Sequence, residues 1–196
     1  MSGSFPITAG FQTLDFQSNS PTRITTSVSG KTQRVKVGGQ FWSFKLKSPA
    51  MTRAQLMADY AFIVQQDGQA ESFTIVPPEV ASTRGTASGT ITINATYAAG
   101  QSTVKGNGAS GTLKKGDIIK FSNHDKVYMI TEDVDMDASS EDTFQIYPPL
   151  TTAVTSSTTV TYNNVPIKVY FDKDEQKYIT QADGTFQYEI VMNEEI

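Results

Sequence analysis

Apolar and polar residues alternate in short runs along most of this chain, which is the pattern of half-buried β-strands. In the run from Gln40 to Lys47, the side chains of Trp42, Phe44 and Leu46 fall on one face. Similar runs lie at residues 24–28, 34–37, 73–76, 89–96, 117–121, 126–131, 142–147, 151–161, 167–171 and 186–190. The pattern predicts a mainly β protein whose strands each bury one face.

Residues that favour turns separate these runs. Gly30-Lys31 divides the first two runs, and Ser122 to Asp125 divides the densest β pattern in the chain. Asp183-Gly184 is a two-residue hairpin signal near the end. We also expect a glycine-rich turn around Gly106 and Gly108. Consecutive runs should therefore pair as antiparallel hairpins.

A single helix is predicted after the Trp42 strand. Thr52 and Gln55 have the spacing of a capping box, and Met51 and Leu56 have the spacing of a hydrophobic staple. Gly68 follows, where a left-handed residue would end the helix. The apolar stripe of this helix is formed by Leu56, Tyr60, Ile63 and Val64.

Two proline sites indicate how the chain divides. Pro77-Pro78 and Pro166 bracket a segment whose first part is rich in Ser, Thr, Gly and Ala. We therefore expect residues 79–162 to form an inserted domain, and residues 1–78 with 163–196 to form a discontinuous second domain. Residues 1–22 read as an extended arm with a few aromatic anchors, or as a partly disordered terminus.

Composition narrows the function. The 196 residues include no cysteine, which excludes disulfides, thiolate metal sites and a Cys nucleophile. The net charge of −4 argues against sequence-specific nucleic-acid binding, which needs clustered cations. The chain contains no run of 18 apolar residues, so we expect no segment that spans a membrane. Met1 to Gly10 does not resemble a signal peptide, so we expect folding in a cytoplasm.

His124 is the only histidine, so a Ser-His-Asp site would have to use it. It lies in a predicted hairpin turn with Ser122 and Asp125 beside it, where bonding to its own backbone is the simpler interpretation. Trp42 reads as a core residue rather than a sugar platform. No pair of carboxylates stands out, and no glycine cluster opens a helix as phosphate loops do. We assign no catalytic, cofactor-binding or ligand-binding residue.

An acidic segment at residues 133–142 begins like a calcium loop. An EF-hand needs Gly at its sixth position and Glu at its twelfth, but Ala138 and Phe144 stand there. Weak calcium binding and a solvated acidic loop both remain open, and no metal ligand is assigned. The carboxylates concerned are Asp133, Asp135, Asp137, Glu141 and Asp142.

Several motifs, in order, resemble distal tail proteins of siphophages, the two-domain type with an inserted barrel. The stretch Val35 to Trp42, then Ser48-Pro49 and the helix with Asp59 to Phe62, resembles their first domain. Lys115 to Thr131 resembles the signature hairpin of the inserted barrel, and Ile146 to Leu150 fits a later strand. Each motif is weak alone, so the resemblance rests on their order and spacing.

The resemblance implies a tail-tube-like β-sandwich with one flanking α-helix, plus an inserted OB-like (oligonucleotide/oligosaccharide-binding-like) β-barrel. It implies a structural subunit of the phage tail tip or baseplate, without enzyme activity or cofactor. Six copies would form a ring that lets DNA pass. The implied partners are the tail tube protein, the baseplate hub protein, and tail fibres or a receptor-binding protein. The implied location is the virion tail tip, after assembly in the host cytoplasm.

Two other functions are compatible with the residues. A carbohydrate-binding module contacting host surface glycans would need exposed aromatic side chains, although aromatic residues also pack between strands. The candidates are Tyr97, Tyr128, Tyr147 and Tyr162. A hydrolase would use His124 or a carboxylate pair.

Overall fold

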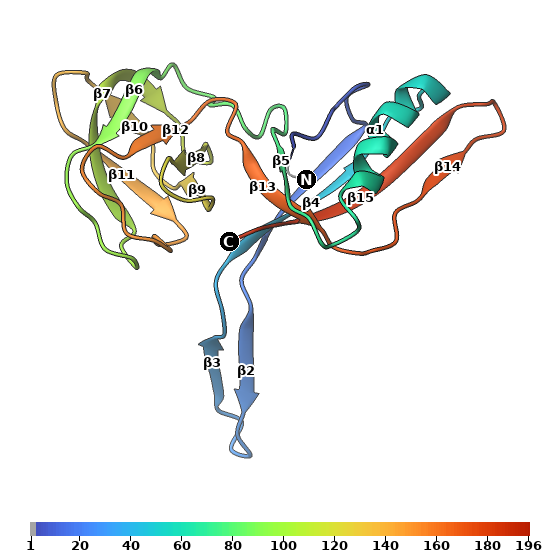
Figure 1. The fold of residues 1–196 in the computed structure, drawn as a ribbon. Helices are drawn as coiled ribbons and strands as arrows, with labels where there is room; N and C mark the ends of the chain where they lie inside the picture. Colours follow the sequence, from blue (N-terminus) through green and yellow to red (C-terminus); the bar gives the residue numbers. More distant parts are fainter. Residues whose placement is uncertain (1–2) are drawn as a thin grey trace. The chain divides into compact units, whose positions relative to one another are not determined.

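A computed structural model describes residues 3–196 (Figure 1). The chain divides into two compact units, one comprising the residues up to Phe73 with Val169–Ile196, and the other Thr74–Lys168. The first contains one helix and an antiparallel sheet, and the second contains a closed barrel. The predicted fold class, mainly β with a flanking helix and a small barrel, is confirmed.

The first unit is built on a sheet in the order β1-β4-β15-β13-β5, with β14 pairing on β15. Its strands are β1 (Thr13–Asn19), β4 (Phe41–Lys47), β5 (Phe73–Ile75), β13 (Ile167–Phe171), β14 (Tyr178–Thr180) and β15 (Phe186–Glu194). Trp42, Phe44 and Leu46 of β4 are buried, as the alternation predicts. Phe44 lies opposite Met192 in the β15 register, and both side chains belong to the core.

The helix α1 (Arg53–Gln65) starts as predicted, because Thr52 and Gln55 form a reciprocal capping box. Leu56 and Ile63 are buried, but Val64 is 59% exposed, so its place in the predicted stripe was wrong. The buried face instead includes Asp59, a carboxylate that is not part of the predicted stripe. A buried carboxylate is tolerated only where donors meet it, and the residues that supply them are distant in sequence.

The N-terminal segment is more ordered than an arm. Its first two residues lie outside the described residues, and β1 within it forms an edge strand paired with β4. Phe5 does act as a predicted aromatic anchor, since it is buried against Phe62, Phe73 and Tyr188. Phe16 stacks on the Trp42 ring at 4.6 Å between ring centroids.

β2 (Thr22–Thr26) and β3 (Thr32–Lys36) form a separate two-stranded hairpin that pairs with no other strand. The turn at Gly30 is present, with a φ of 79°. The apolar residues of this hairpin do not reach a core, because every residue from Ser20 to Gly39 is exposed. The alternating pattern therefore predicted the strands correctly but their burial incorrectly.

The second unit is a closed barrel of six strands in the order β7-β11-β9-β8-β12-β6, completed by pairing of β6 with β7. A seventh strand, β10, pairs with β7 outside the ring. The strands are β6 (Ser88–Ile93), β7 (Thr103–Leu113), β8 (Ile118–Phe121), β9 (Val127–Ile130), β10 (Val134–Met136), β11 (Asp142–Tyr147) and β12 (Thr159–Thr161). The predicted hairpin around Ser122–Asp125 is the β8–β9 pair, but the predicted strand 151–161 is reduced to β12.

The glycines expected to form a turn at Gly106 and Gly108 lie inside the long strand β7 instead. Gly108 has a φ of 95°, and a Cβ there would lie 2.7 Å from the carbonyl oxygen of Thr90. At Gly111 the φ is 92° and the corresponding distance, to the oxygen of Thr86, is 2.3 Å. Strand β7 therefore needs glycine where the barrel closes and neighbouring backbone approaches.

Candidate functional site

His124 lies at the β8–β9 turn, as predicted, but its contacts are not those of a catalytic triad. Its Nε2 atom lies 2.8 Å from the Tyr128 hydroxyl, and its Nδ1 atom lies 2.8 Å from Oδ1 of Asn123. The ring stacks on Phe121 at 5.7 Å between centroids. The imidazole therefore covers the end of the barrel core and orients a buried tyrosine hydroxyl.

The two neighbours of His124 are held by other partners. The Ser122 hydroxyl accepts a hydrogen bond from the Thr159 amide at 3.2 Å. Asp125 binds Lys120 at 2.9 Å and Lys168 at 3.5 Å, and the hydrogen bond from Lys120 lowers the pKa of its carboxyl. Neither side chain is arranged to activate or orient the imidazole as a Ser-His-Asp site requires.

Burial lowers the pKa of His124 below its usual value, and Lys120 acts in the same direction, while Asp125 opposes them. The folded chain therefore favours the neutral ring. The contribution of this ring to stability is complete above the unfolded-state pKa of about 6.5, and it is lost as the pH falls through the lower folded-state value.

The acidic segment 133–142 does not gather its carboxylates. Asp133 accepts hydrogen bonds from the Lys115 amide and the Lys114 ammonium, and the first of these lowers the pKa of its carboxyl most. Asp137 caps the amide of Ser139, and Glu141 pairs with Lys105. Across residues 3–196 no group of three or more His, Cys, Asp or Glu side chains is placed to hold a metal ion.

The four tyrosines considered for glycan binding have different surroundings. Tyr128 is a core residue that sequence alone could not tell from an exposed one. Tyr97 packs partly against the same core, and Tyr147 is 37% exposed. The Tyr162 hydroxyl donates to the carbonyl of Gly89 at 2.6 Å, and its ring lines a shallow groove between β6 and β12.

Asp117 is a buried carboxylate that sequence reasoning missed. It is 2% exposed and accepts hydrogen bonds from the amides of Arg84 and Lys114, at 3.1 and 2.9 Å, and from the Thr83 hydroxyl. It joins the segment before β6 to the turn before β8. In the first unit Asp59 is likewise a buried carboxylate that joins segments distant in sequence.

Asp59 accepts hydrogen bonds from the Tyr188 hydroxyl at 2.9 Å and from the Thr8 hydroxyl. Burial raises the pKa of Tyr188, and the Asp59 carboxylate raises it further. The pair links α1, β15 and the N-terminal segment in the interior of the unit. Both buried carboxylates hold segments in place.

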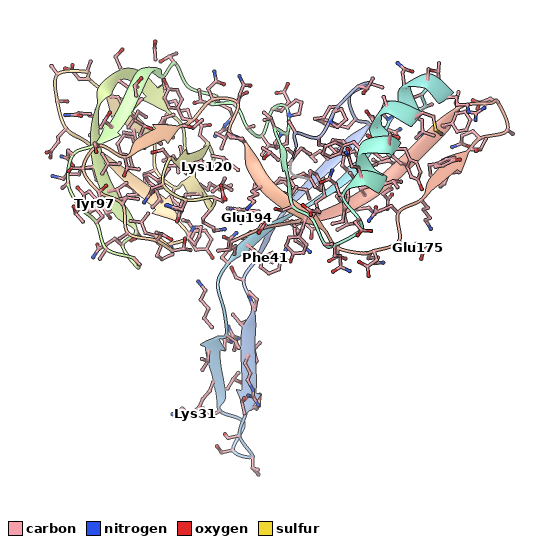
Figure 2. The ribbon with its side chains drawn as sticks, in the orientation of Figure 1. Lys31, Phe41, Tyr97, Lys120, Glu175 and Glu194 are labelled. Atoms are coloured by element: carbon pink, nitrogen blue, oxygen red, sulfur yellow. The ribbon has the colours of Figure 1, made fainter. Side chains whose placement is uncertain are left out.

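Two surfaces of the first unit carry exposed charged side chains. One is the hairpin of β2 and β3, with Lys31 at its turn (Figure 2). The other is the sheet face opposite Trp42 and Phe44, where Lys45 pairs with Glu189 at 3.0 Å. Within residues 3–196 no helix is long and apolar enough to cross a membrane.

Comparison with known proteins finds similarity to distal tail proteins of phages. Residues 79–165, which include most of the barrel unit, match the family model described as distal tail protein pb9, B domain. A curated protein of Escherichia phage T5, named distal tail protein pb9, is 27% identical over 165 residues. That alignment covers 80% of this chain and 76% of the T5 protein.

The chain is therefore a structural protein of a bacteriophage tail. Within that class, its barrel unit matches the B domain of distal tail proteins, and most of the chain is similar to the distal tail protein of phage T5. The resemblance found in the sequence motifs is confirmed. The barrel hairpin from Lys115 to Thr131, which carried much of that resemblance, lies inside the matched region.

Proposed function

We propose that six copies of this chain close into a ring at the tip of the phage tail. The ring joins the tail tube to the baseplate hub and the host-binding components, and its channel lets DNA pass. The observation that carries this proposal is the similarity to distal tail proteins. Residues 79–165 match a distal tail protein domain, and 80% of the chain aligns with a distal tail protein of phage T5. The chain acts in the virion after assembly in the host cytoplasm.

We propose a different role for each of the two domains. Residues 1–78 with 163–196 form the ring, and residues 79–162 form an inserted barrel that bears further tail components such as fibres or a receptor-binding protein. Support comes from the separate cores of the two units and from the range 79–165 of the family match.

Strand edges support self-assembly. In the first unit, β1 and β5 end the sheet, and β14 pairs with β15 alone. Edge strands offer unpaired backbone groups to a neighbouring chain. Contacts between different edges of successive copies are heterologous, and such contacts close into rings when the rotation allows.

Charge supports the passage of DNA. A channel that must not hold DNA needs a lining without dense cations, because Lys and Arg release counterions from phosphate and bind it. The sheet face opposite the Trp42 side chain carries mixed charges, with the Lys45–Glu189 pair at its centre. The negative net charge of the chain has the sign that this function needs.

The proposed role is structural and without catalysis. His124 contacts Tyr128 and Asn123, and its neighbours Ser122 and Asp125 bind elsewhere. The expected consequence is that His124→Ala leaves particle assembly and infectivity at the wild-type level at neutral pH. Loss of infectivity with normal assembly would instead favour a chemical role for the imidazole.

Mass photometry and negative-stain imaging test the ring. The full chain is measured alone and with the tail tube protein of the same phage. Ring-shaped particles with six subunits and a central channel are expected in at least one of the two samples. Monomers throughout, at all concentrations and in both samples, would overturn the ring.

The second candidate is a carbohydrate-binding module. The shallow groove between β6 and β12 is lined by hydroxyl groups, among them Ser88, Thr90 and Thr159, together with the Tyr162 ring. Hydroxyls beside an aromatic ring suit a sugar. A glycan array decides: binding that Tyr162→Ala abolishes would support this candidate, and no signal for the full chain would remove it.

A further inference from the structure

The hairpin of β2 and β3 has a charge opposite to that of the rest of the chain. Between Ser20 and Gly39 there are four cations and no Asp or Glu. The cations are Arg23, Lys31, Arg34 and Lys36. Because the whole chain has a net charge of −4, all the other residues together carry −8. The hairpin and the other residues therefore carry net charges of opposite sign.

The same hairpin presents apolar side chains to solvent. Ile24, Val35 and Val37 are 60%, 62% and 58% exposed. Arg23 lies opposite Val35, and Ile24 lies opposite Arg34, so cations and aliphatic groups are mixed on both faces. A two-stranded hairpin is marginally stable in water without a supporting layer. The hairpin therefore has the character of a segment that is covered by a partner.

The first unit contains an acidic groove of matching chemistry. Two adjoining hollows share Tyr170 of β13 and Glu195, which follows β15. Glu71 lines the first, and the second is lined by Phe41, Glu194 and Ile196. Figure 2 labels Phe41 and Glu194. No Lys or Arg is among the side chains that line either hollow. Carboxylates thus lie beside apolar groups, as cations do on the hairpin.

We propose that the β2–β3 hairpin of one copy docks in this acidic groove of a second copy. The inference rests on the proposed ring and deepens it by naming the contact. Arg34, Lys36 and the neighbouring cations face Glu71 and Glu195, while the exposed valines cover Tyr170 and Phe41. Hairpin and groove are different patches of one chain, so the contact is heterologous and each copy can both give and receive a hairpin.

Nucleic acid is the competing partner for a cationic ribbon. Phosphate binding depends on Lys and Arg and gains nothing from aliphatic groups such as Ile24 and Val35. Protein interfaces, in contrast, combine an apolar centre with a polar rim. The mixture on the hairpin therefore favours a protein partner, and the presence of an acidic groove on the same chain favours a second copy.

Cross-linking tests the contact itself. The chain has no cysteine, so single cysteines can be introduced without a background. Arg34→Cys protein and Gln69→Cys protein are mixed with a short bismaleimide, since Gln69 lines the groove. A mixed dimer is expected. Arg53→Cys replaces Arg34→Cys in the control, because Arg53 is also exposed and lies in the same unit. Equal yields in the two mixtures would overturn the proposal.

Charge exchange tests the chemistry. R34E/K36E and E71K/E195K proteins should each self-associate about tenfold more weakly than wild type or worse, because charge pairs become like-charge contacts. An equimolar mixture of the two variants should recover association, because each hairpin then meets a groove of opposite charge. That recovery also shows that both variants fold. R53E/K115E is the charge-matched control and should behave as wild type, because both side chains are exposed and line neither hollow.

The outcomes separate this contact from the ring. A mixture that does not recover overturns the docking, whatever the wild-type chain forms. A specific cross-link with recovered pairing supports the docking even if no closed six-subunit particle is seen, and the proposed ring then fails alone. If R34E/K36E associates normally but loses salt-dependent retention of double-stranded DNA, the hairpin contacts nucleic acid and the docking is overturned.

Discussion

Asp117 offers the sharpest test of how the barrel unit is held together. Its buried carboxylate accepts hydrogen bonds from the backbone amides of Arg84 and Lys114 and from the Thr83 hydroxyl. Asp117→Ala leaves these three donors without their acceptor inside the protein. A buried donor without a partner costs about 1–3 kcal/mol. Because the emptied site admits water next to the Arg84 side chain, which is 64% exposed, we take the lower end and expect a loss of about 3–5 kcal/mol.

Asp133 is the matched control, because it also receives hydrogen bonds from Lys114 and Lys115 but is solvent-exposed. Asp133→Ala should leave the urea midpoint close to that of the wild type, because the hydrogen bonds of an exposed carboxylate are replaced by water. Urea unfolding of the full chain, followed by hydrogen exchange of residues 88–161, reports the barrel directly. The reasoning would be refuted if Asp117→Ala destabilised these strands no more than Asp133→Ala does.

Three further results are expected. Tyr188→Phe removes one donor from buried Asp59 and should cost about 1–3 kcal/mol, measured by urea unfolding with Trp fluorescence; an unchanged midpoint would contradict this. The melting temperature of the barrel should fall as the pH drops below about 6.5, and His124→Gln should weaken that dependence, checked by calorimetry. Gly184→Ala should lower the free energy of unfolding by about 1–2 kcal/mol, from backbone strain alone. Gly111→Ala should lower it clearly more, because a Cβ there also meets the carbonyl oxygen of Thr86. Equal losses in urea unfolding would refute this.

Patterns that act within a few residues predicted local structure well. The period-2 burial of Trp42, Phe44 and Leu46 is a property of one strand, and it is present. The capping box of Thr52 and Gln55 joins residues three apart, so it also forms as predicted. In these cases the interacting groups are neighbours in sequence, and the rest of the fold has only to leave them undisturbed.

Predictions failed where burial depends on distant segments. Val64 fits the helical spacing but turns away from the sheet, while Asp59 turns inward because Tyr188 and Thr8 supply donors there. Gly106 and Gly108 looked like a turn, although barrel closure needs them within β7. No short window of sequence contains the partners that decide these positions.

The residues considered for the functional site divide in the same way, into those with a local signal and those without one. Sequence alone found His124 in a turn and showed that the acidic segment departs from a calcium loop. It did not find Asp117, because an isolated Asp near a glycine turn has no local signal of burial. The charge pattern of residues 20–39 was visible in the sequence, but its meaning depends on the exposure of the hairpin.

The sequence by itself determined the β class, the single helix and the absence of thiol chemistry, and its ordered motifs indicated the distal tail protein family. Each follows from composition or from short-range periodicity. Only the tertiary structure decided that β2 and β3 stand exposed as a cationic hairpin, that Tyr128 belongs to the barrel core, and that Asp59 and Asp117 are buried. Those outcomes are set by which remote segments exclude water from a side chain, and that is a property of the folded chain.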